Sequence, residues 1–338
     1  QGRPKARSRE HDPMGAKLRT SVFLCCALAL RAVNPVHAQD GDVARYPQRP
    51  INLVVAFSPG GTVDLAFRLV AREVERVLGQ PVVVLNKAGG GGNVAVAAVA
   101  SAKPDGYTVG QVPGQTIFVM PFLEKLQYNP AKDLTFVAQF AEASFAIVVR
   151  KDAPFSSLKD LVAYARQNAE KVNYGTNAAT GVANLVVDQI GKNENVQFTN
   201  IPFKGSPEAQ TALLGGHIAF TAGEFNASMV ESGQIRVLAL FSEKSRPEYP
   251  QTPTLKELGY DIPSPVFHVI AGPKGMPEAI VKKLDEAVAK AVKEPRFIKG
   301  AQELRIPIVY RNNKELSEYV ARNYEVFGKL LTEMGLAK

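Results

Sequence analysis

The stretch Phe57–Asp64 (FSPGGTVD) decides the fold, because it joins an apolar run to an amphipathic segment through a glycine turn. The apolar run, Ile51–Phe57, predicts a buried strand. After the turn, apolar side chains recur at helical spacing from Ala66 to Leu78, and Gly79 stands where a helix would end. A strand, a tight turn and a helix in this order are typical of the first half of a βαβ unit.

The alternation of strands and helices continues outward from this stretch in two blocks. The first block adds strands at 81–85 and 107–112 around a helix at 93–102. The rest of the chain predicts strands at 145–149, 172–175, 198–203, 217–221, 236–241 and 266–271, and helices at 158–168, 180–190, 206–214, 277–293 and 313–331. This order favours mostly parallel sheets with right-handed crossovers. Since no Pro-, Gly- or Ser-rich linker separates the blocks, the sequence favours two lobes joined by crossing strands.

Residues 14–38 have the pattern of a secretory signal peptide. Lys17 and Arg19 form a positive segment, and Ser21–Leu30 is an apolar run too short to span a bilayer. Small residues offer a cleavage point before Gln39, so we expect upstream sequence and leader at 1–38 and a mature chain from about Gln39. Both cysteines fall in this segment, and an exported chain without cysteine suits the periplasm.

The composition is that of an ordinary globular protein, with 46% hydrophobic and 21% charged residues among 338. The formal net charge is +8, but residues 1–38 carry seven Lys/Arg and two acidic residues, which leaves 33 basic and 30 acidic residues elsewhere. A nearly balanced body gives no reason to expect a nucleic-acid partner. Two adjacent cysteines also exclude a disulfide framework and a Cys-rich metal site.

Residues suited to catalysis are scarce in the expected mature chain. Its two histidines, His217 and His268, lie in no metal-ligand spacing and are interpreted as structural. Without cysteine or a Gly-x-Ser-x-Gly turn, the common nucleophile–base pairs are missing. The run Gly89–Gly92 could begin a dinucleotide fingerprint, but no acidic residue ends the strand at 107–112, so we interpret it as a turn packed against the sheet. The sequence predicts no catalytic residue, no metal and no cofactor.

Three strand-to-helix turns are rich in small and polar residues: Ser58–Thr62, Pro113–Ile117 with Thr116, and Tyr174–Thr180. The first and third expose backbone N–H groups at a helix start, where unpaired donors and the helix dipole attract an anion. One such turn from each lobe predicts an anion held between the lobes, each turn binding a carboxylate. The alternative interpretation is that Thr62 and Thr180 only cap their helices.

A series of ordered motifs covers residues 46–335. They are Tyr46-Pro47, Phe57–Asp64, Leu78–Val84, Asn86-Lys87, Gly91–Asn93, Pro104–Thr108, Asn173–Thr176, Pro202–Ser206, Leu214–His217, Pro253–Leu255 and Gly272-Pro273. Together they resemble the Bug family, the TctC-like solute-binding receptors of tripartite tricarboxylate transporters. The resemblance implies a two-lobed α/β fold of the type II periplasmic-binding-protein kind. It also implies a small carboxylate ligand in the cleft, held largely by backbone amides, hydroxyls and ordered waters.

The resemblance carries ligand-binding roles to three segments. These residues are Ser58, Gly60, Gly61, Thr62 and Asp64, then Gly175, Thr176, Asn177 and Thr180, then Lys204, Gly205 and Ser206. Asp64 is open to two interpretations, since it would bond a ligand ammonium if turned to the cleft and cap its helix if turned sideways. Three departures from the family pattern leave the identity of the carboxylate open: Ser58 replaces Pro, Asn184 replaces His, and Thr221–Met229 lacks a usual Pro and is two residues short.

The implied function is capture of a small carboxylate outside the cytoplasm for a tripartite tricarboxylate-type transporter, by a protein that is not an enzyme. We expect lobe 1 at 39–145 and 266–338, and lobe 2 at 146–265. The expected partners are the ligand and membrane transporter subunits, and the protein is expected to be a monomer. Two alternatives remain open: a binding protein that signals through a membrane partner, and a secreted α/β enzyme.

Overall fold

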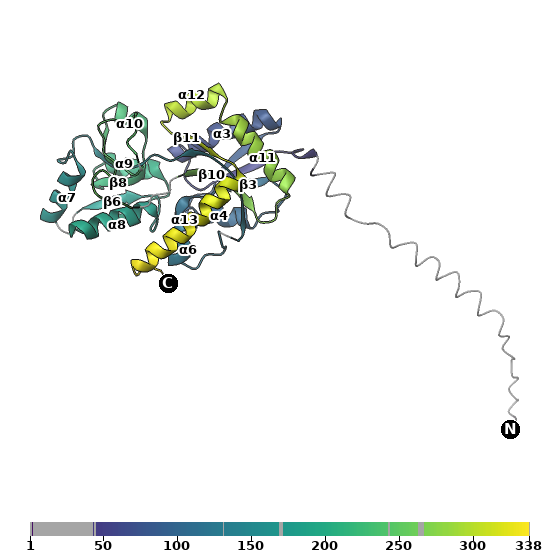
Figure 1. Cartoon of the computed structure of the whole chain (residues 1–338), viewed down its shortest axis with the longest axis horizontal. Helices are drawn as coiled ribbons and strands as arrows, with labels where there is room; N and C mark the ends of the chain where they lie inside the picture. The colour runs from purple at the N-terminus through teal and green to yellow at the C-terminus, as the bar shows by residue number, and fades with distance from the viewer. Residues whose placement is uncertain are drawn as a thin grey trace. The chain divides into compact units, whose positions relative to one another are not determined.

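The computed structural model describes residues 2, 43, 45–130, 132–168, 172–242, 244–262 and 267–337. The expected signal peptide at 14–38, the expected mature start at Gln39 and the expected lobe boundary at 265/266 lie outside the described residues. The chain separates into two units, Gln1–Tyr46 and Pro47–Lys338. The strands and helices labelled in Figure 1 belong to the second unit.

Sheet A has six strands in the order β11-β4-β10-β3-β1-β2. Their bounds are β1 Ile51–Val55, β2 Val82–Asn86, β3 Thr108–Gln111, β4 Leu134–Glu142, β10 Phe267–Pro273 and β11 Ile308–Arg311. β1 pairs in parallel with β2 and β3, whereas β10 runs antiparallel to β3 and β4, and β11 runs antiparallel to β4. The helices packed on this sheet are α3 Thr62–Leu78, α4 Asn93–Ala100, α11 Glu278–Ala291 and α13 Asn313–Glu333. Sheet A and these helices form lobe 1.

Sheet B has five strands in the order β7-β6-β8-β5-β9. Their bounds are β5 Phe145–Arg150, β6 Asn173–Thr176, β7 Thr199–Pro202, β8 Phe220–Glu224 and β9 Ile235–Leu240. β6 pairs in parallel with β7 and β8, and β5 is antiparallel to β8 and β9. The helices of this part of the chain are α7 Leu158–Gln167, α8 Val182–Glu194, α9 Ser206–Leu214 and α10 Ala227–Glu231. Sheet B and these helices form lobe 2.

The predicted two-lobed α/β class is confirmed, and both sheets are mixed, because each combines parallel strand pairs with antiparallel ones. The reason lies in how the chain passes between the sheets. β4 ends at Glu142 and β5 begins at Phe145, so β5 starts at the edge that faces sheet A and must run away from it. β10 likewise enters sheet A from the edge facing sheet B, and it therefore runs against β3 and β4.

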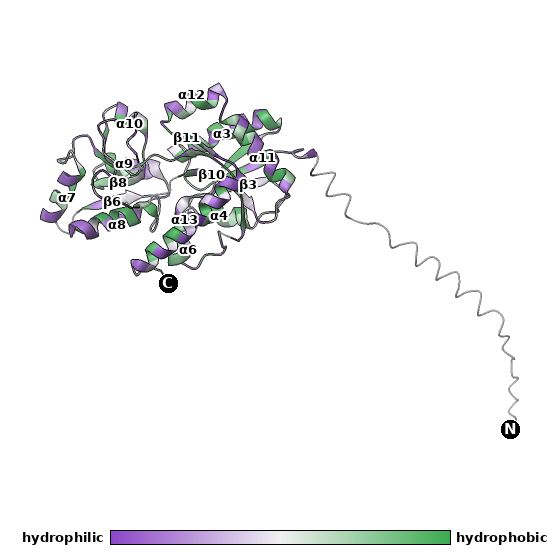
Figure 2. Ribbon diagram, viewed as in Figure 1, coloured by the Kyte–Doolittle hydropathy of each residue, from purple (hydrophilic) through white to green (hydrophobic). Residues whose placement is uncertain are grey.

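The predicted βαβ opening is confirmed to within one or two residues at each boundary of β1, α3, β2, α4 and β3. Two predicted elements had wrong boundaries: α8 runs past Gly191 to Glu194, and β8 spans Phe220–Glu224 instead of 217–221. The sequence analysis also missed several elements, namely α5 Gly114–Phe118, α6 Met120–Leu123, α10, α12 Pro295–Glu303, β4 and β11. Helices such as α13 alternate hydrophilic and hydrophobic residues along the ribbon, as amphipathic surface helices do (Figure 2).

Aromatic side chains fill the space between α3 and sheet A. Phe67 of α3 is fully buried and meets Phe140 of β4 edge to face, with ring centroids 5.0 Å apart. It also contacts the ring of His268 on β10 at 5.8 Å. This packing fixes the direction in which α3 leaves the sheet, and with it the position of the turn before the helix.

Phe67→Ala should lower the free energy of unfolding by about 3–5 kcal/mol, since it removes a buried aromatic ring and leaves a cavity. Leu65→Ala on the same helix is the matched control, because Leu65 is 39% exposed, and it should change stability by about 0.5 kcal/mol or less. Urea unfolding followed by circular dichroism measures both. Equal effects of the two changes would contradict this account of the α3 packing.

Candidate functional site

Strand ends from both sheets meet where the chain crosses between them. In sheet A the register places Phe267 opposite Glu142, at the carboxyl end of β4. In sheet B it places Phe145 opposite Glu224, at the carboxyl end of β8. The carboxyl ends of the parallel strands therefore face each other across a two-residue crossing, which is where ligands bind in open α/β sheets.

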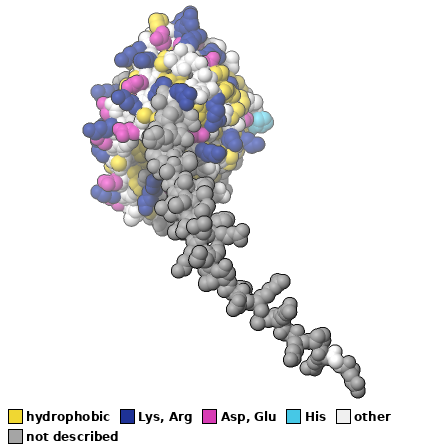
Figure 3. Space-filling model, turned by 90° about the vertical axis from the view of Figure 1, so that its right-hand side faces the viewer, with side chains coloured by type: hydrophobic (Ala, Val, Ile, Leu, Met, Phe, Trp, Pro, Cys, Tyr) yellow, Lys and Arg dark blue, Asp and Glu magenta, His cyan; other side chains and the backbone are white. Residues whose placement is uncertain are grey.

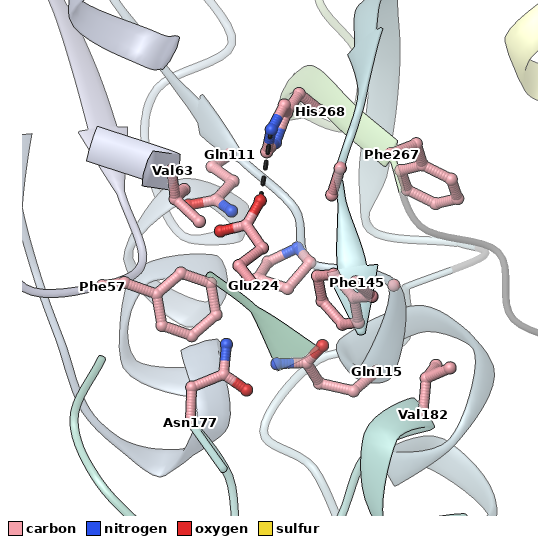
Figure 4. Close-up of a pocket in the computed structure, with 13 residues that line it drawn as sticks. Phe57, Val63, Gln111, Gln115, Phe145, Asn177, Val182, Glu224, Phe267 and His268 are labelled. Carbon is pink, nitrogen blue, oxygen red and sulfur yellow. Dashed lines mark ion pairs between the residues drawn. The ribbon is translucent and has the colours of Figure 1, made fainter. Parts of the chain in front are cut away.

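An inner cavity lies at this meeting point (Figure 4). It is lined by Phe57, Val63, Gln111, Pro113, Gly114, Gln115, Ala143, Phe145, Asn177, Val182, Glu224, Phe267 and His268. Its volume is about 20 Å³, which is room for one water-sized group, since a single water needs roughly 10–15 Å³. The lining is aromatic and carboxamide-rich, with one carboxyl and one imidazole.

Glu224 of lobe 2 and His268 of lobe 1 face each other in this cavity, with Oε1 of the carboxyl 3.3 Å from Nε2 of the imidazole (Figure 4). Both side chains are buried, at 2% and 1% exposure. Within the described residues, neither carboxyl oxygen and neither imidazole nitrogen makes a hydrogen bond of good geometry. Buried polar atoms without partners are rare in folded proteins, and they mark a site where a partner is missing.

Burial determines the charge of this pair. It raises the pKa of Glu224 to about 8, against a smaller lowering effect from the backbone N–H of Val63 at the start of α3. Burial also lowers the pKa of His268 to about 3. At neutral pH the carboxyl is therefore protonated and the imidazole is neutral, so the pair has no net charge and holds one proton on the carboxyl and one on the imidazole.

An outer cavity of about 410 Å³ opens beside the inner one and shares Phe57 and Asn177 with it. Lobe 1 lines it with the glycine run and with Phe57, Asn93, Met120 and Glu124, and lobe 2 lines it with 177–180 and 202–204. The run adopts positive φ at all four glycines, including 134° at Gly89 and 104° at Gly92, which other residues avoid. Its interpretation as a turn packed on the sheet was therefore incomplete, because the run also forms a wall of the cleft.

The first predicted loop lies at the contact between the lobes. The hydroxyl of Ser58 donates to Glu208 of α9 at 2.6 Å, and the hydroxyl of Thr62 donates to the carbonyl of Phe225 at 3.2 Å. A Cβ added at Gly61 would lie 2.9 Å from the hydroxyl oxygen of Ser206. Ser58, Gly61 and Thr62 thus meet lobe 2 directly in this structure.

Asp64 caps its own helix. Its carboxylate accepts hydrogen bonds from the backbone N–H of Gly60 at 2.9 Å, from Arg68 at 2.9 Å and from Asn86 at 2.8 Å. Burial acts to raise the pKa of Asp64, but these hydrogen bonds and the Arg68 charge outweigh burial and leave the pKa below its usual value. All of these partners belong to lobe 1, and Asp64 lines neither cavity. The geometry corresponds to the capping interpretation.

In the second predicted loop, Tyr174–Thr180, some residues line the cleft and others make contacts only within lobe 2. Asn177 lines both cavities, and Thr180 lines the outer one while donating to Glu124 of lobe 1 at 3.0 Å. Thr176 is buried, and its hydroxyl donates to the carbonyl of Ala178 at 2.5 Å. Gly175 is packed inside lobe 2, because an added Cβ would lie 2.7 Å from Ile218 of the same lobe.

The remaining predicted residues lie in the outer cavity, at the contact between the lobes, or in neither place. Lys204 lines the outer cavity. Gly205 precedes α9 and approaches Ser58, since an added Cβ would lie 3.2 Å from the Ser58 backbone nitrogen. Ser206 begins α9 beside Gly61. Thr116 is buried with its hydroxyl bonded to the carbonyl of Pro113 at 2.7 Å, and it lines neither cavity.

Sequence reasoning missed Glu224 and the carboxamides Gln111 and Gln115, and it interpreted His268 as structural. The sequence does contain a signal for Glu224. This residue follows a run of apolar and small residues, and its charge has no local partner along the chain. Gln111 ends β3, and its side-chain Oε1 accepts a 3.0 Å hydrogen bond from the backbone N–H of Ala56. Gln111 and Glu224 therefore share a position at the end of a strand, whereas Gln115 lies in α5.

Two further features bear on the chemistry of the described residues. They contain no cluster of three His, Cys, Asp or Glu side chains able to hold a metal ion, and no helix among them has the length and apolarity to cross a membrane. On the face seen in Figure 3, the coloured basic side chains are interspersed with acidic and apolar ones. That face offers no broad single-sign patch of the kind that binds a nucleic-acid backbone.

Comparison with known proteins gives a consistent result. The family model described as the tripartite tricarboxylate transporter family receptor, TctC, matches residues 66–336. A protein of Cupriavidus necator, described as the UPF0065 protein in the gbd 5' region, is 35% identical over 92% of this chain and 94% of its own. The solved structure of the periplasmic binding protein BugD is 28% identical, with a TM-score of 0.81 over 87% of this chain and all of BugD. Rpa4515 of R. palustris, solved with adipate, is 28% identical, with a TM-score of 0.79 over 86% of this chain and 99% of its own.

Asp64→Asn should lower the free energy of unfolding by about 1–3 kcal/mol at neutral pH, because it removes a charge that accepts three hydrogen bonds. The folded pKa lies below the unfolded value, so this stabilisation is present above pH 3.8 and is lost as pH falls through the folded pKa. The difference between wild type and variant in urea unfolding should therefore shrink in acid.

Asp261→Asn serves as the control at an exposed position and should leave stability unchanged at every pH. Ligand affinity should be the same in both variants as in wild type. A loss of affinity in Asp64→Asn without a loss of stability would instead favour the ligand-binding interpretation of Asp64.

Proposed function

The chain belongs to the tripartite tricarboxylate transporter family of receptors, and we propose that it captures a small organic carboxylate between its two lobes. The resemblance predicted from the sequence motifs is confirmed by this membership. The family is one of solute-binding receptors, which does not favour the enzyme alternative.

One observation carries the proposal: a cleft whose walls are backbone-rich loops from both lobes. The outer cavity, at about 410 Å³, has the size for a small organic acid. The glycine run lets a ligand approach the backbone closely, and Asn177, Thr180 and Lys204 add polar groups from the opposite side. A carboxylate is the ligand that amide donors and a lysine bind best. The adipate held by Rpa4515 is such a ligand.

The inner cavity is too small for an organic acid, so a ligand that reaches it requires the lobes to part and then close. We assign the moving parts to the expected lobes, 39–145 with 266–338 and 146–265, joined at the two crossings. The predicted ligand contacts are the cleft-lining residues Asn177, Thr180 and Lys204, together with Ser58, Gly61, Thr62 and Ser206 where the lobes meet.

The proposed compartment is the periplasm, where BugD is found, and the proposed partners are the membrane subunits of a tripartite transporter. We propose that the protein acts as a monomer, since the cleft is built from one chain. A signalling role through a membrane sensor would use the same cleft and is distinguished by the partner that the loaded protein binds.

The direct test is mass spectrometry of the small molecules released when the purified protein is denatured. We expect an organic carboxylate, and we expect that compound to raise the melting temperature of the ligand-free protein, because binding to the folded state alone stabilises it. A panel of dicarboxylates, amino acids and aromatic acids in the same thermal assay covers the case of ligand lost in purification. If no carboxylate raises the melting temperature, the proposed function fails.

Gly61→Val should abolish ligand binding while the protein stays folded. A Cβ at this position would lie 2.9 Å from the hydroxyl oxygen of Ser206 and 3.1 Å from the ring of Pro207, so a branched side chain holds the lobes apart. The backbone at Gly61 is extended, with φ at −77°, and valine adopts this conformation without strain.

Calorimetric titration measures affinity, and small-angle scattering should show an increased radius of gyration that ligand does not reduce. Ala163→Val, which adds the same methyl groups at an exposed position of α7, should bind like wild type. Full affinity in Gly61→Val would show that this contact between the lobes is not part of the binding-competent arrangement.

A further inference from the structure

Glu224 and His268 are the buried titratable groups of the cleft that the proposed function does not use. They come from different lobes, β8 and β10, and face each other 3.3 Å apart with all four of their polar atoms short of a hydrogen-bond partner. A pair left in this condition between two lobes is complete only when a third group supplies the missing hydrogen bonds.

Among the described residues, neither lysine nor arginine lines the inner cavity. Gln111 of β3, Gln115 of α5, Phe145 of β5 and Phe267 of β10 line the same cavity. The nearest acid on α3, Asp64, is turned to Arg68 and Asn86 instead. Among the described residues that line the cavity, Glu224 and His268 are therefore the titratable groups, and Glu224 is the one whose pKa lies near neutral pH.

We propose that Glu224 is a specificity-determining residue that receives an ammonium group of the ligand, so that the ligand is an amino acid or a related carboxylate carrying a cationic N–H group. This inference rests on the proposed function and narrows its ligand class. The carboxylate of such a ligand lies in the outer cavity, and its ammonium enters the inner one.

The size of the inner cavity selects the group that enters it. At about 20 Å³ it accepts one heavy atom with its hydrogens, such as an ammonium, whereas a carboxylate has three heavy atoms. A second carboxylate would also meet the carboxyl of Glu224 with no lysine or arginine among the described lining residues to compensate. The faces of Phe57 and Phe145, which line the same cavity, favour a cation further.

The test compares acids that share one carbon skeleton: aspartate, malate and succinate, and likewise alanine, lactate and propionate. Calorimetric titration of the full mature protein should show the amino acid binding about 10- to 150-fold more tightly than its deaminated counterpart, the range expected for a hydrogen bond to a charged group. Glu224→Gln should remove this difference while still binding carboxylates. Glu318→Gln, at an exposed position of α13, should keep it.

The outcomes separate the two proposals. If all members of a series bind equally to wild type, or if the hydroxy acid equals the amino acid, Glu224 does not select an ammonium, although the carboxylate function stands. If Glu224→Gln keeps the preference for the amino acid, the inference also fails. If no member of any series binds to wild type, the inference fails together with the carboxylate function.

Proton release gives a readout that needs no variant. Glu224 carries a proton at pH 7 because burial raises its pKa to about 8, and pairing with an ammonium must ionise it. Titrations in two buffers of different ionisation enthalpy should therefore show about one proton released per amino acid bound, and affinity should fall as pH drops below about 8. Binding of an amino acid without proton release would overturn the inference, even if Glu224→Gln proves too unstable to study.

Discussion

The two-residue crossing Ala143-Ser144 between β4 and β5 is the constraint on which the rest of this structure depends. So short a connection obliges the two sheets to meet at one edge, with their parallel strands ending toward each other. The crossing is also braced, because Ser144 donates to the carbonyl of Arg305 at 3.0 Å and accepts a hydrogen bond from the buried guanidinium of Arg246. The floor of the cleft is therefore made of strand ends held by sheet hydrogen bonds, and its walls are made of the loops that follow those strands.

Because strand ends form the floor of the cleft and loops form its walls, the cleft can recognise an anion although the protein body has a nearly balanced charge. Loops after β1 and β2 and the loop before α8 supply backbone and hydroxyl groups whose positions follow from the strands they leave. Amide dipoles fixed in this way act on a ligand at short range and need no surplus of lysine or arginine. The first and second loops also contact the opposite lobe through Ser58 and Thr180, so the loops proposed to bind the ligand are also loops that join the two lobes in this structure.

The sequence was sufficient for features that depend on neighbours along the chain. The strand, turn and helix around Phe57–Asp64 follow from local periodicity, and so does the capping box of Ser157 and Asp160 at the start of α7. The predicted end of α8 was wrong because Gly191 lies inside the helix and does not end it. Glycine is required there for close packing, since a Cβ would lie 2.7 Å from the carbonyl oxygen of Val196. The sequence analysis did not identify β4, because a central strand is buried on both faces and shows no alternation of apolar and polar residues. Its polar residue Gln139 accepts a hydrogen bond from Arg311, which lies far along the chain.

The cleft floor could not be predicted, because Glu224 and His268 lie 44 residues apart on different sheets and meet only once the crossing is formed. Their burial without partners opposes the contact between the lobes, since unsatisfied polar groups raise the free energy of that arrangement. A ligand shifts an equilibrium only by the difference between its contacts in the two states. A group that satisfies Glu224 makes such a contact only when β8 and β10 are brought together, so the same unpartnered carboxyl both selects the ligand and couples its binding to closure.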